Sequence, residues 1–286
     1  MLKPALVGYA LATACLTVLV PAWGATNSAG GVYPSGINWA VKIGNDLYQT
    51  LDEDCQKKIN PQTVCTEQAD APEITPVQNQ DGGKTPCQVL ISTGFVDLIN
   101  HIAHAKAIDR IQHGYFQQYV SLLAQGPAGN IPPDPPNLTD PRYWSDAVMN
   151  EQASYFNQMA GIAISINLSH HYLGHCQKYA GKMPDGKPAP INHLITQAEW
   201  EASVKAGTLN ALDCALGTQG AAALFEAVGG MPQRPAWADY IAPMNVNIKN
   251  LNKQLAQYEA AFYRGGLKLD KPVAGLTKAP RAFVAN

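Results

Sequence analysis

The sequence predicts an all-α protein, a helical bundle of four to five main helices with long loops, in a single domain over residues 37–270. Apolar residues recur at helical spacing over several long segments, and no hairpin signature or strict apolar–polar alternation is present. Clusters of proline and glycine separate these segments. The chain has 286 residues, 46% hydrophobic and 15% charged, which is enough to bury a core. Residues 271–286 are expected to form a C-terminal tail.

The N-terminus, residues 1–24, resembles a signal peptide. Lys3 precedes an apolar run, and the sequence Ala-Trp-Gly at 22–24 offers small residues for cleavage before Ala25. A lipobox ending at Cys15 is an alternative interpretation. No later segment has ~18 consecutive apolar residues, so no transmembrane span is expected after cleavage. These features predict a periplasmic or secreted protein.

The first half of the mature chain predicts two helices and a long loop. Residues 25–36 are rich in glycine, serine and alanine and predict a flexible leader. A helix is expected at about 38–58, and the proline-containing segment 60–88 is expected to be loop. Residues 89–125 predict one long helix, bent at Gly114. The first helix has apolar residues four apart: Trp39, Ile43, Leu47 and Leu51.

The middle of the chain predicts a stiff connection followed by a second long helix. Six prolines between 127 and 141 exclude a helix there. Asp140 and Pro141 form a favourable helix start, and the helix is expected to continue to about residue 180. A further loop is expected at 181–194.

Three more helices are predicted in the C-terminal part. Thr196 and Glu199 form a capping box that opens the first of them, and a short helix is expected near 219–228. The last helix, 243–264, has an apolar seam with spacings of four and three. This seam either packs within the protein's own bundle or forms a homo- or hetero-oligomer contact. Its residues are Met244, Ile248, Leu251, Leu255, Tyr258 and Phe262.

Five cysteines remain once Cys15 is removed with the signal peptide. Disulfides persist in an oxidising compartment, and Cys55 with Cys65 is the expected pair because the two close a short loop. The remaining three leave one thiol over, which is either buried and inert, paired between chains, or a metal ligand. These three are Cys87, Cys176 and Cys214.

The charge balance argues against a nucleic-acid partner. Lys and Arg number 20 and Asp and Glu number 22, with no basic cluster to neutralise phosphates. The expected partner is instead a small-molecule or lipid-like ester substrate.

The histidines carry the strongest functional signal, because all seven lie between residues 101 and 193. Two stripes, with spacings of 0, +4, +7 and 0, +4, +8, would place imidazoles on two antiparallel helices. About three to five nitrogen and oxygen ligands could then meet at one point, which suits zinc and also iron or copper. The first stripe is Asp97, His101 and His104, and the second is Asn167, His171 and His175.

Individual residues of this cluster have distinct expected roles. Asp97 is a ligand, a general base or an acceptor that orients an imidazole. His170 and His171 point about 100° apart on a helix, and the i+4 spacing favours His171 as the neighbour of His175. His113 lies opposite the first stripe, and His193 is on a loop.

The segment 168–174, Leu-Ser-His-His-Tyr-Leu-Gly, resembles the metal-ligand segment of the zinc-dependent phospholipase C / P1 nuclease family. In that family a histidine and an aspartate four residues apart bind zinc, and these positions correspond to His171 and His175. The resemblance implies an exported all-α protein that hydrolyses phosphodiesters with a trinuclear zinc cluster. The chain departs from the pattern at His175, which replaces the aspartate, and after it, where Cys-Gln-Lys-Tyr replaces Gln-Pro-x-His. Its first tryptophan after the expected cleavage is Trp39, whereas the family has one at the N-terminus.

Three functional hypotheses follow from the sequence. The first is an exported metal-dependent hydrolase of phosphoesters or related esters, with histidine-bound zinc between two long helices. The second is metal or cofactor binding without hydrolysis, although the absence of CxxCH excludes covalent c-type haem. The third is a non-enzymatic periplasmic or envelope binding or assembly protein, such as a component of a secretion or transfer apparatus.

Overall fold

The computed structural model describes five stretches of the chain, residues 34–77, 87–125, 132–179, 189–231 and 234–265. The expected signal peptide, most of the expected leader and the expected C-terminal tail lie outside the described residues. None of the described helices is both long enough and apolar enough to cross a lipid bilayer.

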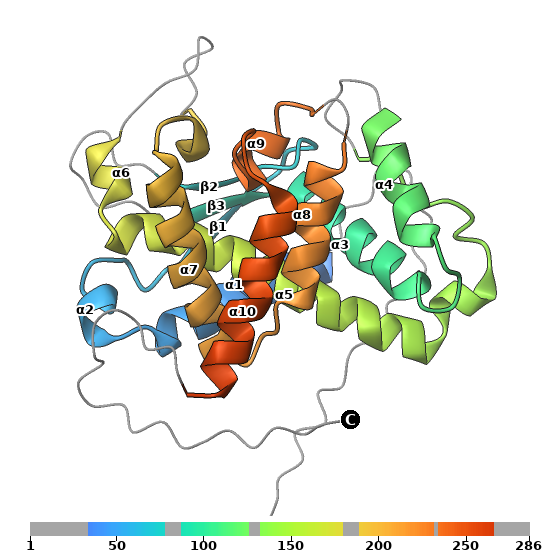
Figure 1. Cartoon of the computed structure of the whole chain (residues 1–286), viewed down its shortest axis with the longest axis horizontal. Coiled ribbons are helices and arrows are strands. Elements are labelled where there is room, and N and C mark those ends of the chain that lie inside the picture. Colours follow the sequence, from blue (N-terminus) through green and yellow to red (C-terminus); the bar gives the residue numbers. More distant parts are fainter. Residues whose placement is uncertain (1–33, 78–86, 126–131, 180–188, 232–233, 266–286) are drawn as a thin grey trace, which may run out of the picture.

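The described residues form a mostly helical fold with a small sheet, so the all-α prediction is confirmed only in outline. Among the described residues, seven helices have eleven or more residues, which exceeds the predicted four to five. Figure 1 shows their arrangement. They are α1 (Pro34–Thr50), α3 (Thr93–Ile108), α4 (Tyr115–Gln125), α5 (Asp146–Tyr172), α7 (Gln197–Asp213), α8 (Gln219–Gly229) and α10 (Ile248–Tyr263). The short helices are α2 (Glu53–Gln56), α6 (His175–Lys178) and α9 (Ala238–Ile241), with 3-10 turns η1 (Pro141–Trp144) and η2 (Ile191–His193).

A three-stranded sheet replaces part of the predicted loop 60–88 and the start of the predicted helix 89–125. Its order is β1 (Val64–Glu67), β3 (Val89–Ser92), β2 (Ile74–Pro76), with β1 parallel and β2 antiparallel to β3. Each strand has three or four residues, which is too short to display a period-two pattern. The buried side chains of β3 also fit the helical spacing that follows, so the sequence pattern concealed it.

The disulfide joins Cys65 to Cys87 across this sheet, so the predicted pairing of Cys55 with Cys65 is wrong. Cys65 lies on β1, and Cys87 lies two residues before β3, with a Cα–Cα distance of 5.7 Å. Parallel pairing of β1 with β3 brings the two cysteines together, although 22 residues separate them in sequence. Cys55, Cys176 and Cys214 remain thiols.

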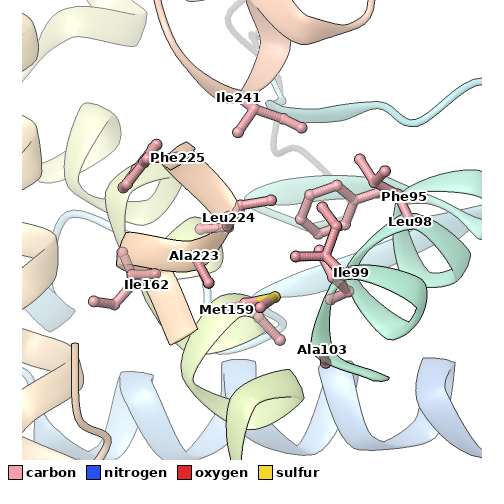
Figure 2. Packing of buried hydrophobic residues seen from close by; sticks show 14 of the residues in the cluster. Phe95, Leu98, Ile99, Ala103, Met159, Ile162, Ala223, Leu224, Phe225 and Ile241 are labelled. Carbon is pink, nitrogen blue, oxygen red and sulfur yellow. The ribbon is translucent and has the colours of Figure 1, made fainter. Parts of the chain in front are cut away.

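Helix α5 is the centre of the fold and packs against α1, α3, α7 and α8. Its middle turns are buried on all sides, which explains why a 27-residue helix shows no strong amphipathic pattern. Figure 2 shows this core, where Phe95 and Ile99 of α3 meet Met159 of α5, Leu224 of α8 and Ile241 of α9. Burial of the apolar side chains of the whole core is the dominant favourable contribution to the free energy of folding.

Both predicted long helices are interrupted, so these two predictions are wrong in length. The chain leaves α3 after Ile108 and starts α4 at Tyr115, with Gly114 at φ 86° between them. Helix α5 ends at Tyr172, and Gly174 at φ 85° separates it from α6. A left-handed glycine ends a helix readily, because no Cβ opposes that conformation.

Several predicted helix boundaries are confirmed. Thr196 and Glu199 form both hydrogen bonds of the capping box at the start of α7. The helix predicted near 219–228 is α8, which ends at Gly229. The side chain of Asp140 accepts a hydrogen bond from the backbone N–H of Arg142, as predicted for a cap. The element that begins at Pro141, however, is the 3-10 turn η1 and not the following α-helix.

The apolar seam of the last helix packs inside the protein. Leu251 and Leu255 are buried where α10 contacts α7 and α8, which leaves Met244 as the exposed end of the seam. We therefore expect Leu255→Ala to lower the free energy of unfolding by at least about 2 kcal/mol, because it opens a cavity in the core. Urea denaturation checks this, with Gln257→Ala on the exposed face of α10 as the matched control. A loss of association with unchanged stability would instead identify an oligomer seam.

Candidate functional site

The histidines of α3 lie in two separate polar contacts near the start of α5. His101 Nε2 lies 3.4 Å from Asp134 Oδ1, and its ring meets the ring of Tyr119 on α4 edge-on. His104 Nε2 donates a 2.8 Å hydrogen bond to the backbone carbonyl of Tyr143. Asp97 lies half-buried one turn before His101 on the same helix. Asp134, from the proline-rich connection, thus supplies a carboxylate beside His101.

Burial keeps the α3 imidazoles neutral. Desolvation is the main cause that lowers the pKa of His101 to about 4, with the Asp134 carboxylate opposing the shift and the neighbouring His104 contributing to it. Desolvation also lowers the pKa of His104, against its hydrogen bond to Tyr143. His101 therefore binds a proton more weakly in the native protein than in the unfolded chain.

This difference predicts acid destabilisation. Between the unfolded pKa of 6.5 and the native pKa of about 4, the unfolded state takes up a proton that native His101 does not, so stability falls as pH falls. From pH 7 to pH 5 we expect a loss of about 2 kcal/mol from His101 alone. Urea denaturation across this range should show a shallower pH dependence in His101→Gln and an unchanged one in the exposed His113→Gln. Equal slopes in all three proteins would contradict this assignment.

The second group of histidines lies at the other end of α5, and it is not arranged as predicted. His171 Nε2 donates a 2.7 Å hydrogen bond to the backbone carbonyl of Gln88, beside the disulfide. His170 instead faces His175, with 3.0 Å between the two Nδ1 atoms. The predicted pairing of His171 with His175 is therefore wrong. It assumed a continuous helix, whereas the turn at Gly174 directs His175 back toward His170.

Ser203 of α7 completes a triangle of polar atoms with this histidine pair. Its Oγ lies 3.2 Å from His170 Nδ1 and 3.3 Å from His175 Nδ1, and it also donates to the Glu199 carbonyl at 3.1 Å. All three side chains are buried. We call the set His170, His175 and Ser203 the His–His–Ser triangle.

Both imidazoles of the triangle are held in the neutral form. Desolvation, with smaller contributions from the neighbouring His175 and His171, lowers the pKa of His170 to about 3, although the Glu199 charge opposes the shift. Desolvation also lowers the pKa of His175, again against the Glu199 charge. A neutral imidazole retains a lone pair on one ring nitrogen, which is the form that binds a metal ion.

A salt-linked clamp closes the triangle from α7. Glu199 Oε1 accepts from Lys178 Nζ at 2.7 Å, and Oε2 accepts from the Tyr179 hydroxyl at 2.8 Å. Hydrogen bonds from Lys178, Thr196 and Tyr179 hold the pKa of Glu199 well below its usual range. Because Glu199 and Ser203 are one turn apart on α7, the clamp fixes α6 against the same face that carries Ser203.

The two histidine groups do not converge, so the predicted site between the two long helices is wrong. Asn100, next to His101, accepts a 2.9 Å hydrogen bond from Gln152 near the start of α5. Gln152 and His170 are 18 residues apart on one continuous helix, which corresponds to about 27 Å along its axis. Figure 1 agrees, since α4, which contacts His101, and α6, which carries His175, lie on opposite sides of the molecule.

The donor set of the triangle fits a tetrahedral metal ion better than the predicted stripes do. Two nitrogens bound to one zinc at 2.0–2.1 Å in tetrahedral geometry lie about 3.3 Å apart. The three edges of the triangle measure 3.0, 3.2 and 3.3 Å. Counting only His, Cys, Asp and Glu, the described residues contain no group of three that could hold a metal. The third donor here is a serine hydroxyl, a residue type that sequence spacing did not suggest.

Sequence reasoning missed His170 and Ser203 for different reasons. On an unbroken helix His170 would point about 100° away from His171, the i+4 partner of His175, and Gly174 is the sequence signal for the break. Ser203 lies 33 residues beyond His170, and nothing in the local pattern links them. Comparisons with protein-family models, with curated proteins and with solved structures find no match to this chain.

Proposed function

We propose that this chain is an exported metal-dependent hydrolase that binds zinc at the His–His–Ser triangle. The observation that carries the proposal is the mutual spacing of two neutral imidazole nitrogens and one hydroxyl at tetrahedral edge lengths. Export is supported by the Cys65–Cys87 disulfide, because disulfides persist mainly in oxidising compartments. Iron and copper also bind imidazole nitrogen, so the metal analysis must distinguish them from zinc.

The triangle would leave a coordination position for water. A zinc ion held by His170, His175 and Ser203 would lower the pKa of a bound water toward ~7, which is the chemistry it would supply for hydrolysis of a phosphoester or related ester. On the protein side, Ser203 and the Glu199 clamp hold His175 in place.

Zinc titration of the full-length protein, followed calorimetrically and by elemental analysis, tests the proposal. We expect one zinc per chain, with His170→Gln and His175→Gln each weakening binding at least about 100-fold, since even partners outside the ligand set are worth 10–100-fold. Ser203→Ala should weaken binding about 10-fold. The matched control is the exposed His113→Gln, which should bind as the unaltered protein does.

Hydrolysis is measured separately from binding. A phosphodiester with a chromogenic leaving group should be cleaved by the zinc-loaded protein, not by the chelated protein, and again after zinc is restored. Zinc binding without turnover would leave a metal-binding protein and remove the hydrolase assignment. Zinc bound equally well by all the histidine variants would overturn the site itself.

A further inference from the structure

We propose that His193 is a second reactive site, independent of the metal proposal, in which an imidazole activated by Asp239 attacks small acyl esters. His193 lies at the end of η2 and its Nε2 is 2.9 Å from Asp239 Oδ2 on α9. A carboxylate that accepts from one ring nitrogen fixes the tautomer and makes the other nitrogen a better base.

Asp239 is itself held on both sides. Arg234 Nη2 donates to Asp239 Oδ1 at 3.2 Å, and the same nitrogen donates to the backbone carbonyls of Ala238 and Ala242. The side-chain amide of Asn192 donates to the Asp239 backbone carbonyl at 2.9 Å, which joins η2 to α9. These hydrogen bonds hold the Asp239 carboxylate in its orientation toward His193.

The side chains of Asp239 and Arg234 are largely buried, whereas the side chain of His193 is exposed, as a reactive imidazole must be. The Asp239 and Arg234 side chains are 12% and 14% exposed, whereas the His193 side chain is 40% exposed. The carboxylate is thus shielded from water while the imidazole is accessible. The Nδ1 atom of His193, the nitrogen turned away from Asp239, makes no hydrogen bond to the described residues that would occupy its lone pair.

The cluster also contains two buried polar atoms whose hydrogen-bonding capacity the described residues leave unused. Arg234 Nε and Asn192 Oδ1 are buried and have no hydrogen-bond partner among them. One buried donor and one buried acceptor beside the same dyad indicate that a small polar molecule belongs there, because unsatisfied buried groups are costly.

The chemistry favours an acyl ester over a phosphoester at this position. The positive charge of Arg234 is paired with the Asp239 carboxylate, and its Nη2 also donates to two carbonyl groups, so the cluster has no excess positive charge for a phosphate. In the step we propose, the Nδ1 lone pair attacks the acyl carbon and the ester C–O bond breaks. The leaving alkoxide takes the proton released from Nε2 through solvent, while Asp239 stabilises the transient imidazolium. Water then adds to the acyl-imidazole and releases the carboxylic acid.

Acylation of His193 in the full-length protein tests this inference. Diethylpyrocarbonate is added at neutral pH in the presence of a chelator, so that the metal proposal does not enter, and each histidine is followed by peptide mass spectrometry. His193 should react at least about tenfold faster than His113, although both side chains are exposed, and Asp239→Asn should abolish this advantage. Asp46→Asn, which alters an exposed ion pair on α1, is the matched control and should leave it intact.

Turnover of p-nitrophenyl acetate supplies a second readout. Under chelation we expect His193→Gln to lose at least about tenfold in rate, while His113→Gln keeps it. The comparison of two histidines within the unaltered protein remains decisive even where Asp239→Asn does not fold. His193 reacting no faster than His113 would show that His193 and Asp239 form a structural ion pair, and would overturn the inference.

Discussion

Gly207→Val is expected to lower the free energy of unfolding by about 4 kcal/mol, because α5 and α7 cross in direct backbone contact at this position. A Cβ on Gly207 would lie 2.6 Å from the Ile166 amide nitrogen and 2.8 Å from its Cα. Neither atom can move away without shifting α5, so the two helices must separate. Equilibrium urea unfolding measures the change.

The same substitution should damage the His–His–Ser triangle. Gly207 lies one turn beyond Ser203 on α7, and Ile166 lies one turn before His170 on α5. Helices that separate at the crossing therefore also separate Ser203 from His170, and we expect zinc binding to weaken at least about tenfold. Ala202→Val on the exposed face of α7 is the control, with an expected cost of a few tenths of a kcal/mol from helix propensity. Stability within about 1 kcal/mol of the unaltered protein would contradict this account of the crossing.

Loss of the Cys65–Cys87 disulfide is expected to cost about 3 kcal/mol. In the chain-entropy account, a crosslink across 22 residues restricts the unfolded chain by this amount. The double variant Cys65→Ser, Cys87→Ser removes the crosslink without leaving a single reactive thiol. Its urea midpoint should fall well below that of the unaltered protein under non-reducing conditions.

The control for the disulfide is a thiol that carries no crosslink. Cys176 is partly buried, and desolvation raises its pKa to about 12, so it is a poor nucleophile at neutral pH. Cys176→Ser should change stability by less than about 1 kcal/mol. If both variants lose the same amount, or if reduction leaves the unaltered protein's midpoint unchanged, the disulfide does not contribute as argued.

Local sequence patterns predicted the helices of this fold well and its interruptions poorly. Capping at Thr196 and the Gly229 end of α8 depend on contacts within four residues, and both predictions were confirmed. The strands are too short to show an alternation of apolar and polar residues, so the sequence patterns predict a loop and the start of a helix where the sheet lies. The pairing of Cys65 with Cys87 depends on that sheet, and it could not be predicted before the sheet was known.

The candidate site shows the same division between local and tertiary information. The clustering of histidines in the middle of the chain is visible in the sequence, and His175 belongs to the proposed His–His–Ser triangle. His101 and His104 do not join it, because a 27-residue helix places the two groups at opposite ends. His170 joins the site because the chain turns at Gly174, and Ser203 joins it because α5 and α7 cross closely at Gly207. Each contact therefore depends on one glycine.

The most direct test of the central claim is anomalous diffraction from crystals of the full-length protein loaded with zinc. We expect one ion bound to Nδ1 of both His170 and His175 at 2.0–2.1 Å, with Ser203 Oγ beside it. An ion bound elsewhere, or a triangle that retains its direct histidine contact at saturating zinc, would contradict it.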